Sequence, residues 1–216
     1  MDALSRRSGS RVRRLTGVGL TIVVLVGAVA VGYALNGTWV GLTTLRLRWR
    51  RMVVAAVVAQ TGGAALGILG VTDARRGYVV GLALSAMCAA AFCVGNRSVP
   101  GVSLVTLGLA VNALVVILNG AMPVSIVAAL RAGVPITDIA AGYDARHTIA
   151  GEGTTLRSLG DVVPLPLPIR PEVVSAGDVL VAAGLGELVV MGMLRRRVSG
   201  PGRRRAVMDG EDRAEE

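Results

Sequence analysis

Long apolar runs, separated by short polar gaps, dominate the pattern along the chain. They lie at about residues 16–35, 52–71, 78–94, 101–118 and 179–194 and consist mainly of Val, Ala, Leu and Gly. An α-helix needs roughly 20 residues to cross about 30 Å of hydrocarbon. The pattern therefore predicts an all-α fold, a polytopic transmembrane bundle of about five helices.

A polar region interrupts the pattern between residues 119 and 178. Gly120 and Pro123 end the fourth run, because Gly adopts the left-handed helix cap and Pro cannot continue a helix. Ser175 and Asp178 precede the fifth run with the spacing of a capping box. We predict a partly ordered extracytoplasmic segment, 119–178, with a membrane helix at each end.

Two stretches of this segment carry predictions of their own. Residues 125–142 hold an arginine, a proline and an aspartate, which favour an interfacial amphipathic helix over a partial sixth span. Residues 162–171 alternate Pro with apolar residues, which favours extended polyproline structure. We expect the parts near Asp161 and Asp178 to fold over the outer end of the bundle, close to Asn119.

The composition agrees with a membrane protein. Of the 216 residues, 53% are hydrophobic and 17% charged, whereas a soluble domain carries about a quarter charged residues. The net charge of +9 raises the question of nucleic acid. The basic residues are all arginines, and they gather in the terminal segments and short gaps, as topology determinants do. We therefore expect no nucleic-acid partner.

These arginines also suggest the domain limits and the orientation. Residues 1–14 form an arginine-rich extension, 15–194 the membrane domain and 195–216 a charged, disordered tail. More of the short-loop arginines fall on the side of the C-terminus, which places that terminus in the cytoplasm and the N-terminus outside. A cleaved signal peptide ending near Ala28-Val29-Ala30 is the alternative for the first run.

The gap before the second run alternates Leu and Arg. We interpret Arg46, Arg48, Trp49, Arg50 and Arg51 as a lipid-facing basic belt. Each arginine near anionic headgroups contributes about 1 kcal/mol, and Trp anchors at the membrane interface. A plain topology signal without lipid specificity is the other interpretation.

Polar side chains inside the apolar runs are candidates for function. Asn112 and Asn119 are seven residues apart and share a helix face; Gln60, in the second run, is a suitable partner. They form either interhelical hydrogen bonds, at about 0.6–2 kcal/mol each, or the polar lining of a ligand or ion path. Glu187, an acid within the fifth run, is a further candidate.

The chain has one histidine, His147, with Asp144, Glu152 and Asp161 near it in sequence. These residues lack the spacing of a metal site, such as His-x-x-x-His or paired Cys. The two cysteines, Cys88 and Cys93, share one apolar run and are expected to be packing residues. We expect no metal, no cofactor and no catalytic constellation, and a structural hydrogen-bonding role for His147.

Three blocks, NGAMPVS (119–125), HTIAGEGTTLRSLGDVVPLPLP (147–168) and SAGDVLVAAGL (175–185), resemble in order and spacing the signatures of a bacterial membrane protein family, domain of unknown function 5317, frequent in actinobacteria and other Gram-positive bacteria. The resemblance covers about residues 32–190. It departs at Ala121, where a second glycine is usual. It implies a shared membrane architecture but no activity. The positions it marks are Asn112, Asn119, Gly120, Pro123, Val124, His147, Leu159, Gly160, Asp161, Pro164, Ser175, Gly177 and Asp178.

We expect a structural or partner-binding component of the cell envelope, whose partners are membrane lipid and other membrane proteins or a second copy of the chain. The alternative is a small transporter or ligand-binding subunit that uses Asn112, Asn119, Gln60 and Glu187. A membrane-embedded enzyme built on His147 and Asp161 is the third possibility. The absence of a catalytic pattern favours a protein that is not an enzyme.

Overall fold

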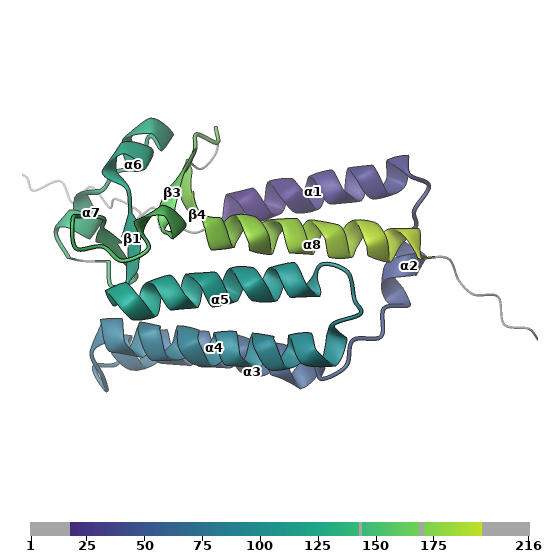
Figure 1. Ribbon diagram of the computed structural model, residues 1–216, viewed down its shortest axis with the longest axis horizontal. Helices are drawn as coiled ribbons and strands as arrows, with labels where there is room; N and C mark the ends of the chain where they lie inside the picture. The colour runs from purple at the N-terminus through teal and green to yellow at the C-terminus, as the bar shows by residue number, and fades with distance from the viewer. Residues whose placement is uncertain (1–17, 143, 169–170, 196–216) are drawn as a thin grey trace, which may run out of the picture.

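The computed structural model describes residues 18–142, 144–168 and 171–195. Five long helices run side by side, and a small unit of strands and short helices, residues 120–175, covers one end of them (Figure 1). We call this unit the cap, and the two ends of the helices the cap end and the far end. The predicted extension 1–14 and residues 196–216 of the predicted tail lie outside the described residues. The long helices are α1 (Val18–Ala34), α3 (Arg50–Ile68), α4 (Ala74–Asn96), α5 (Val102–Asn119) and α8 (Ala176–Leu194).

Four of these helices, α3, α4, α5 and α8, are long and apolar enough to cross a membrane. The described part of α1 has 17 residues and is apolar but shorter. α4 begins four residues before the predicted position, because Asp73 acts as its N-cap and accepts a hydrogen bond from the N–H of Arg76. α8 begins three residues early, directly after Ser175. In both cases a capping side chain, and not the first apolar residue, sets the start.

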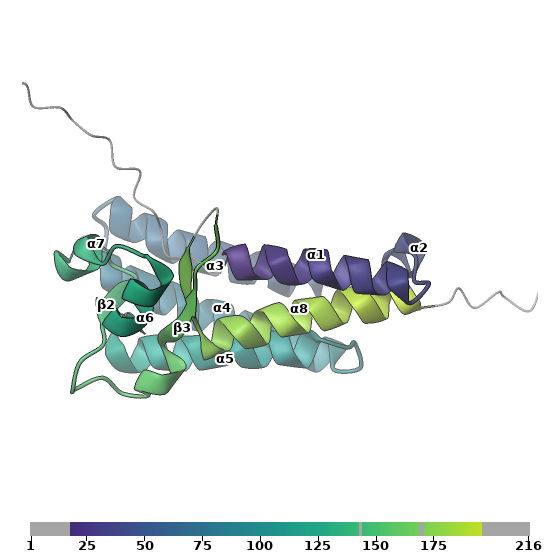
Figure 2. The same cartoon turned by 90° about the horizontal axis from the view of Figure 1, so that it is seen from above.

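The long helices pack in the order α3, α4, α5, α8, α1, each on the next, and the view from above shows α8 between α1 and α5 (Figure 2). Glycines allow close approach: a Cβ on Gly63 would overlap the carbonyl oxygen of Gly77, and a Cβ on Gly108 that of Gly177. Small residues at such crossings let helix backbones pack tightly without a hydrophobic driving force. The short helix α2 (Trp39–Thr43) lies against α8 at the far end.

The cap contains a four-stranded sheet, so the all-α prediction is wrong in this region. The strands are β1 (Met122–Val124), β2 (His147–Ile149), β3 (Asp161–Leu165) and β4 (Glu172–Ser175), in the order β2-β1-β3-β4. β1 pairs in parallel with β2 and β3, and β3 is antiparallel to β4. β1 and β2 have three residues each, too few for an alternating pattern, and the partners of β1 are distant in sequence, so periodicity could not reveal them.

The stretch 125–142 forms two short helices, α6 (Ile126–Ala132) and α7 (Thr137–Ala140). Neither helix is long enough for a partial sixth span, and the expected amphipathic helix is divided into two; its place at the membrane interface stays a prediction. Gly133 ends α6 with a φ of 75°. Ala128 and Ala129 are buried against Val124 and Val173, so the apolar face of α6 completes the core of the cap.

The proline-rich stretch is also partly a strand. Pro164 lies in β3, opposite Val173 of β4, whereas polyproline structure was predicted. β1 pairs with β3 only at Val124 and Asp161 among the described residues. Pro164 lies past the end of this pairing, so β1 needs no backbone N–H from it, which is the position that Pro requires in a sheet.

At the far end, Asn96 organises the segment that precedes α3. Its side chain is buried, accepts from the N–H of Arg48 at 2.8 Å and donates to the carbonyl oxygen of Arg48 at 2.8 Å. Trp49 follows with a φ of 54° and is 52% exposed. The side chains predicted to form the basic belt, Arg46, Arg48, Trp49, Arg50 and Arg51, are all exposed.

Candidate functional site

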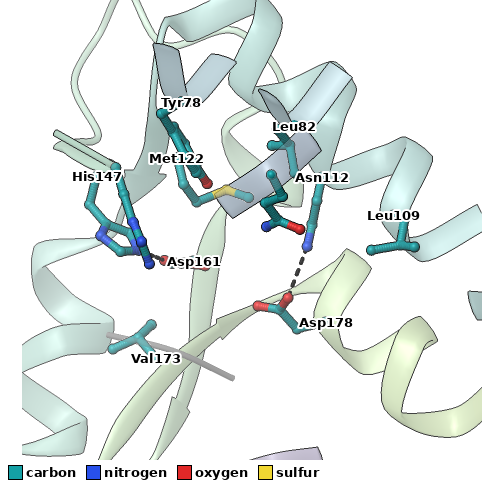
Figure 3. Close-up of a pocket in the computed structure, with 11 residues that line it drawn as sticks. Tyr78, Leu82, Leu109, Asn112, Met122, His147, Asp161, Val173 and Asp178 are labelled. Atoms are coloured by element: carbon teal, nitrogen blue, oxygen red, sulfur yellow. Dashed lines mark hydrogen bonds and ion pairs between the residues drawn. The ribbon is translucent and has the colours of Figure 1, made fainter. Parts of the chain in front are cut away.

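A cavity of about 220 Å³ lies between the cap and the cap end of the helices (Figure 3). Its wall combines polar and ionisable side chains with apolar ones from several separate segments. The lining residues are Gln60, Tyr78, Leu82, Leu109, Asn112, Met122, Arg146, His147, Asp161, Val173 and Asp178. Of the sequence-predicted residues, Gln60, Asn112, His147, Asp161 and Asp178 are brought together here.

Asn112 joins α5 to the start of α8. Its amide nitrogen donates to Asp178 Oδ1 at 2.8 Å (Figure 3), and its oxygen accepts from Ser175 Oγ at 2.8 Å. Ser175 Oγ also accepts from the N–H of Asp178 at 3.0 Å, while Asp178 Oδ2 accepts from the N–H of Ser175 at 3.1 Å. The predicted capping box is confirmed. Gln60 lines the same cavity, but the hydrogen-bond partners of Asn112 are Asp178 and Ser175.

Asn119 has a different role. Its amide nitrogen donates to the carbonyl oxygens of Val115, at 2.8 Å, and Thr155, at 2.9 Å, and its oxygen accepts from the N–H of Thr155 at 2.9 Å. The side chain thus pairs with the backbone of the loop before η1 (Arg157–Leu159). Gly120, with a φ of 74°, is the left-handed C-cap of α5 as predicted. Pro123 lies in β1.

His147 lies between two carboxylates. Its Nδ1 is 2.7 Å from Asp144 Oδ2, and its Nε2 is 3.7 Å from Asp161 Oδ2. The first distance is a strong hydrogen bond, and the second is an ion-pair distance only. Figure 3 shows the His147 ring directed towards Asp161, from β2 across β1 to β3. His147 and Asp161 are both buried.

The two carboxyl groups shift in opposite directions. Burial raises the pKa of Asp161 to about 7, with Asp178 and Asp144 adding to the rise and His147 opposing it. Burial also acts to raise the pKa of Asp144, but the hydrogen bond and charge of His147 and the N–H of Arg146 outweigh it, and the pKa is lowered. Asp161 therefore exchanges a proton near neutral pH while Asp144 stays ionised.

Two polar lining residues, Arg146 and Tyr78, were not predicted. The Arg146 guanidinium lies 6.0 Å from the centroid of the Tyr78 ring, at the limit of a cation–π contact. The carbonyl oxygen of Arg146 accepts from the N–H of Met122, which holds this residue beside β1. In the sequence, the position of Arg146 next to the single histidine was the one signal of a role in the site. Tyr78 stands at the start of an apolar run, and nothing in the sequence indicated a role for it.

Glu172 is a further residue whose role the sequence did not reveal. Its side chain is fully buried, and its carboxylate accepts from the N–H of Gly19, at 2.9 and 3.1 Å, and from that of Leu20 at 3.4 Å. The first N–H groups of a helix have no partner within the helix and carry partial positive charge. Glu172 therefore satisfies the start of α1 from β4.

Glu187 lies elsewhere. It is exposed on α8, eleven residues after Ala176, which is roughly 16 Å along the helix axis. Cys88 and Cys93 are free thiols. Within residues 18–142, 144–168 and 171–195, no group of three or more His, Cys, Asp or Glu side chains is arranged to hold a metal ion.

The fold is thus that of a mostly helical protein with membrane-length helices and a small capping sheet. A model of a family of unknown function, DUF5317, matches residues 44–190, and the chain belongs to this family. No curated protein and no solved structure matches the chain.

Proposed function

We propose that this protein is a multi-pass membrane protein that binds a ligand in the cavity beneath its cap. The cavity itself carries the proposal. It concentrates Asn112, Arg146, His147, Asp161 and Asp178 in a chain whose long helices are mainly apolar. A concave site that combines apolar walls with a few convergent polar groups and a perturbed pKa is the usual form of a binding site.

The distribution of charge supports an orientation. Among the residues described by the structure, the far end carries arginines and no acid, whereas the cap end carries both signs. Arginine-rich ends stay in the cytoplasm, so the cap faces outside and α8 ends inside. Alkaline phosphatase fused within the cap, at Glu152, is expected to be active, and the same fusion after Arg195 inactive. The far-end arginines are Arg46, Arg48, Arg50, Arg51, Arg97 and Arg195.

Ligand binding is tested by thermal unfolding of the purified protein in detergent. Soluble polar solutes and anionic, cationic and neutral amphiphiles are added in turn. A ligand that binds the folded state raises the unfolding temperature by mass action. The matched variant Leu109→Trp fills the cavity and should abolish the rise. If none of these classes raises the unfolding temperature of the wild type, the proposal is wrong.

A second function, partner binding within the membrane, is favoured by Glu187. Exposing an acid to lipid on a membrane helix costs free energy unless a polar group of another helix pairs with it. Under this second proposal the partner is a polar membrane helix or a second copy of this chain. Under this proposal Glu187→Leu lowers the mass of the complex isolated in mild detergent, while Met191→Leu, on the same exposed face, leaves it unchanged. An unchanged mass for Glu187→Leu would remove this candidate. In both proposals the protein has no catalytic role.

A further inference from the structure

We propose that the ligand of the cap cavity is an amphiphile with an anionic, phosphate-bearing headgroup, and that Arg146 binds this headgroup. The inference rests on the proposed function and adds the chemical class of the ligand. A membrane phospholipid is the source to which we commit. A free phosphate ion shares the headgroup chemistry and is separated from it by the experiment below.

The charges in the cavity point to an anion. The carboxylate of Asp178 is satisfied by Asn112 and by the start of α8, and that of Asp161 lies beside His147. Across the described part of the chain, the ion pairs within 4.0 Å are those of His147, so no carboxylate pairs with Arg146 there. Arg146 is half-buried, and although its charge helps to lower the pKa of Asp144, the two groups do not form a close ion pair. A phosphate group matches the geometry of the guanidinium and would give it a direct partner.

Asp161 does not oppose this choice. With a pKa raised to about 7 by burial, about half of it is neutral at pH 7. A neutral carboxyl group repels no anion and can donate a hydrogen bond to a phosphate oxygen.

The apolar wall points to an amphiphile. Leu109 is ten residues from the cap end of α5, and Leu82 eight residues from that of α4, which is roughly 15 and 12 Å along the helices. The cavity thus extends from the charged groups of the cap along the membrane-length helices α4 and α5. Gln60 of α3 also lines the cavity, and its side chain is exposed. A lipid headgroup with the first part of its chain fits this arrangement of polar and apolar walls.

Site-specific photo-cross-linking tests the inference in the full chain. In a background of Cys88→Ala and Cys93→Ala, Gln60→Cys is modified with benzophenone maleimide and the protein is placed in lipid nanodiscs. Equal amounts of radiolabelled phosphatidylglycerol and phosphatidylcholine are offered in parallel samples. Val58→Cys is the matched control, because Val58 is 61% exposed on the same helix but lies about 200° around the helix axis from Gln60 and so points away from the cavity.

Both lipids carry a phosphate, but the choline ammonium of phosphatidylcholine offsets its charge. We therefore expect phosphatidylglycerol, which keeps its net negative charge, to be enriched over phosphatidylcholine about fivefold to tenfold at position 60. At position 58 the two lipids should cross-link equally. Arg146→Gln should reduce the enrichment to that at position 58, and Arg146→Lys should retain part of it. Arg131→Gln, which removes an exposed charge of the cap, should leave it unchanged.

Equal cross-linking at positions 60 and 58, or an enrichment that Arg146→Gln does not reduce, would overturn the inference. Loss of the enrichment on adding inorganic phosphate would overturn the lipid source in favour of the free ion. Should Arg146→Gln fail to fold, the comparison of positions 60 and 58 and the phosphate competition still decide. The two experiments can also give different answers. If a cationic or neutral amphiphile stabilises the protein, Leu109→Trp abolishes this effect and the two lipids cross-link equally, the cavity is a binding site but its ligand is not anionic.

Discussion

The carboxylate of Glu172 accepts hydrogen bonds from the N–H of Gly19, across 153 positions of the sequence. It places a buried negative charge at the start of α1, where the helix dipole favours it. Because Glu172 belongs to β4, which leads directly into α8, the contact ties the cap to both helices at once.

Glu172→Gln is therefore expected to destabilise the fold by about 1–3 kcal/mol, since it weakens charged hydrogen bonds at a buried site. Thermal unfolding in detergent, followed by circular dichroism, measures the change. Glu152→Gln, at an exposed position of the cap, removes the same charge and should leave the midpoint within error. A midpoint for Glu172→Gln equal to the wild type would show that the charge at the start of α1 is not stabilising.

The pKa of Asp161 predicts a pH dependence of stability. Because this pKa is raised from 3.8 to about 7, the folded protein retains a proton that the unfolded chain has already lost. The stability contribution is complete below the ordinary pKa and is lost as the pH rises through about 7. The complete loss is on the order of 4 kcal/mol. The charged and titratable groups that face this carboxyl are His147, Asp144 and Asp178.

Asp161→Asn keeps the shape of the side chain and stays neutral. Its unfolding midpoint should fall less than that of the wild type between about pH 5 and about pH 8. Work above pH 5 also avoids the titration of Asp144, whose lowered pKa acts in the opposite sense at lower pH. Parallel curves for the wild type and Asp161→Asn would contradict the prediction.

The sequence predicted the features that are local or strongly periodic. Apolar runs indicated the long helices, Gly120 the end of α5, and Ser175 with Asp178 the start of α8. The nearness of His147 to Asp144 followed from their spacing of three residues. The family resemblance was confirmed by the match to residues 44–190.

What the sequence missed depends on contacts between distant segments. β1 has three residues and continues an apolar pattern, so nothing marks it as a strand. The pairing of Asn112 with Asp178 spans 66 positions, and an amide in a membrane-length helix gives no sign of which element will meet it. Arg146 looked like an ordinary loop arginine in the sequence. Its place in the cavity follows from the pairing of β1 with β2, which the sequence did not reveal.

The hydrogen bond between Asn112 and Asp178 permits a direct test of how α5 holds α8. Asn112→Ala leaves Asp178 without its side-chain donor, and Asp178→Ala removes both that acceptor and half of the capping box. We expect each variant to lose about 1–2 kcal/mol. The double variant should lose less than the sum, with a coupling energy of about 0.5–3 kcal/mol, because the shared bond is counted twice.

Ser125→Ala provides the contrast for this cycle. Ser125 caps α6 through a separate hydrogen bond to the N–H of Ala128, so Ser125→Ala and Asn112→Ala should be additive within about 0.5 kcal/mol. Unfolding in detergent at one pH provides all five values. Additive losses for Asn112→Ala and Asp178→Ala would mean that the two side chains stabilise the protein independently, and that the junction of α5 and α8 depends on the packing of Gly108 against Gly177 instead.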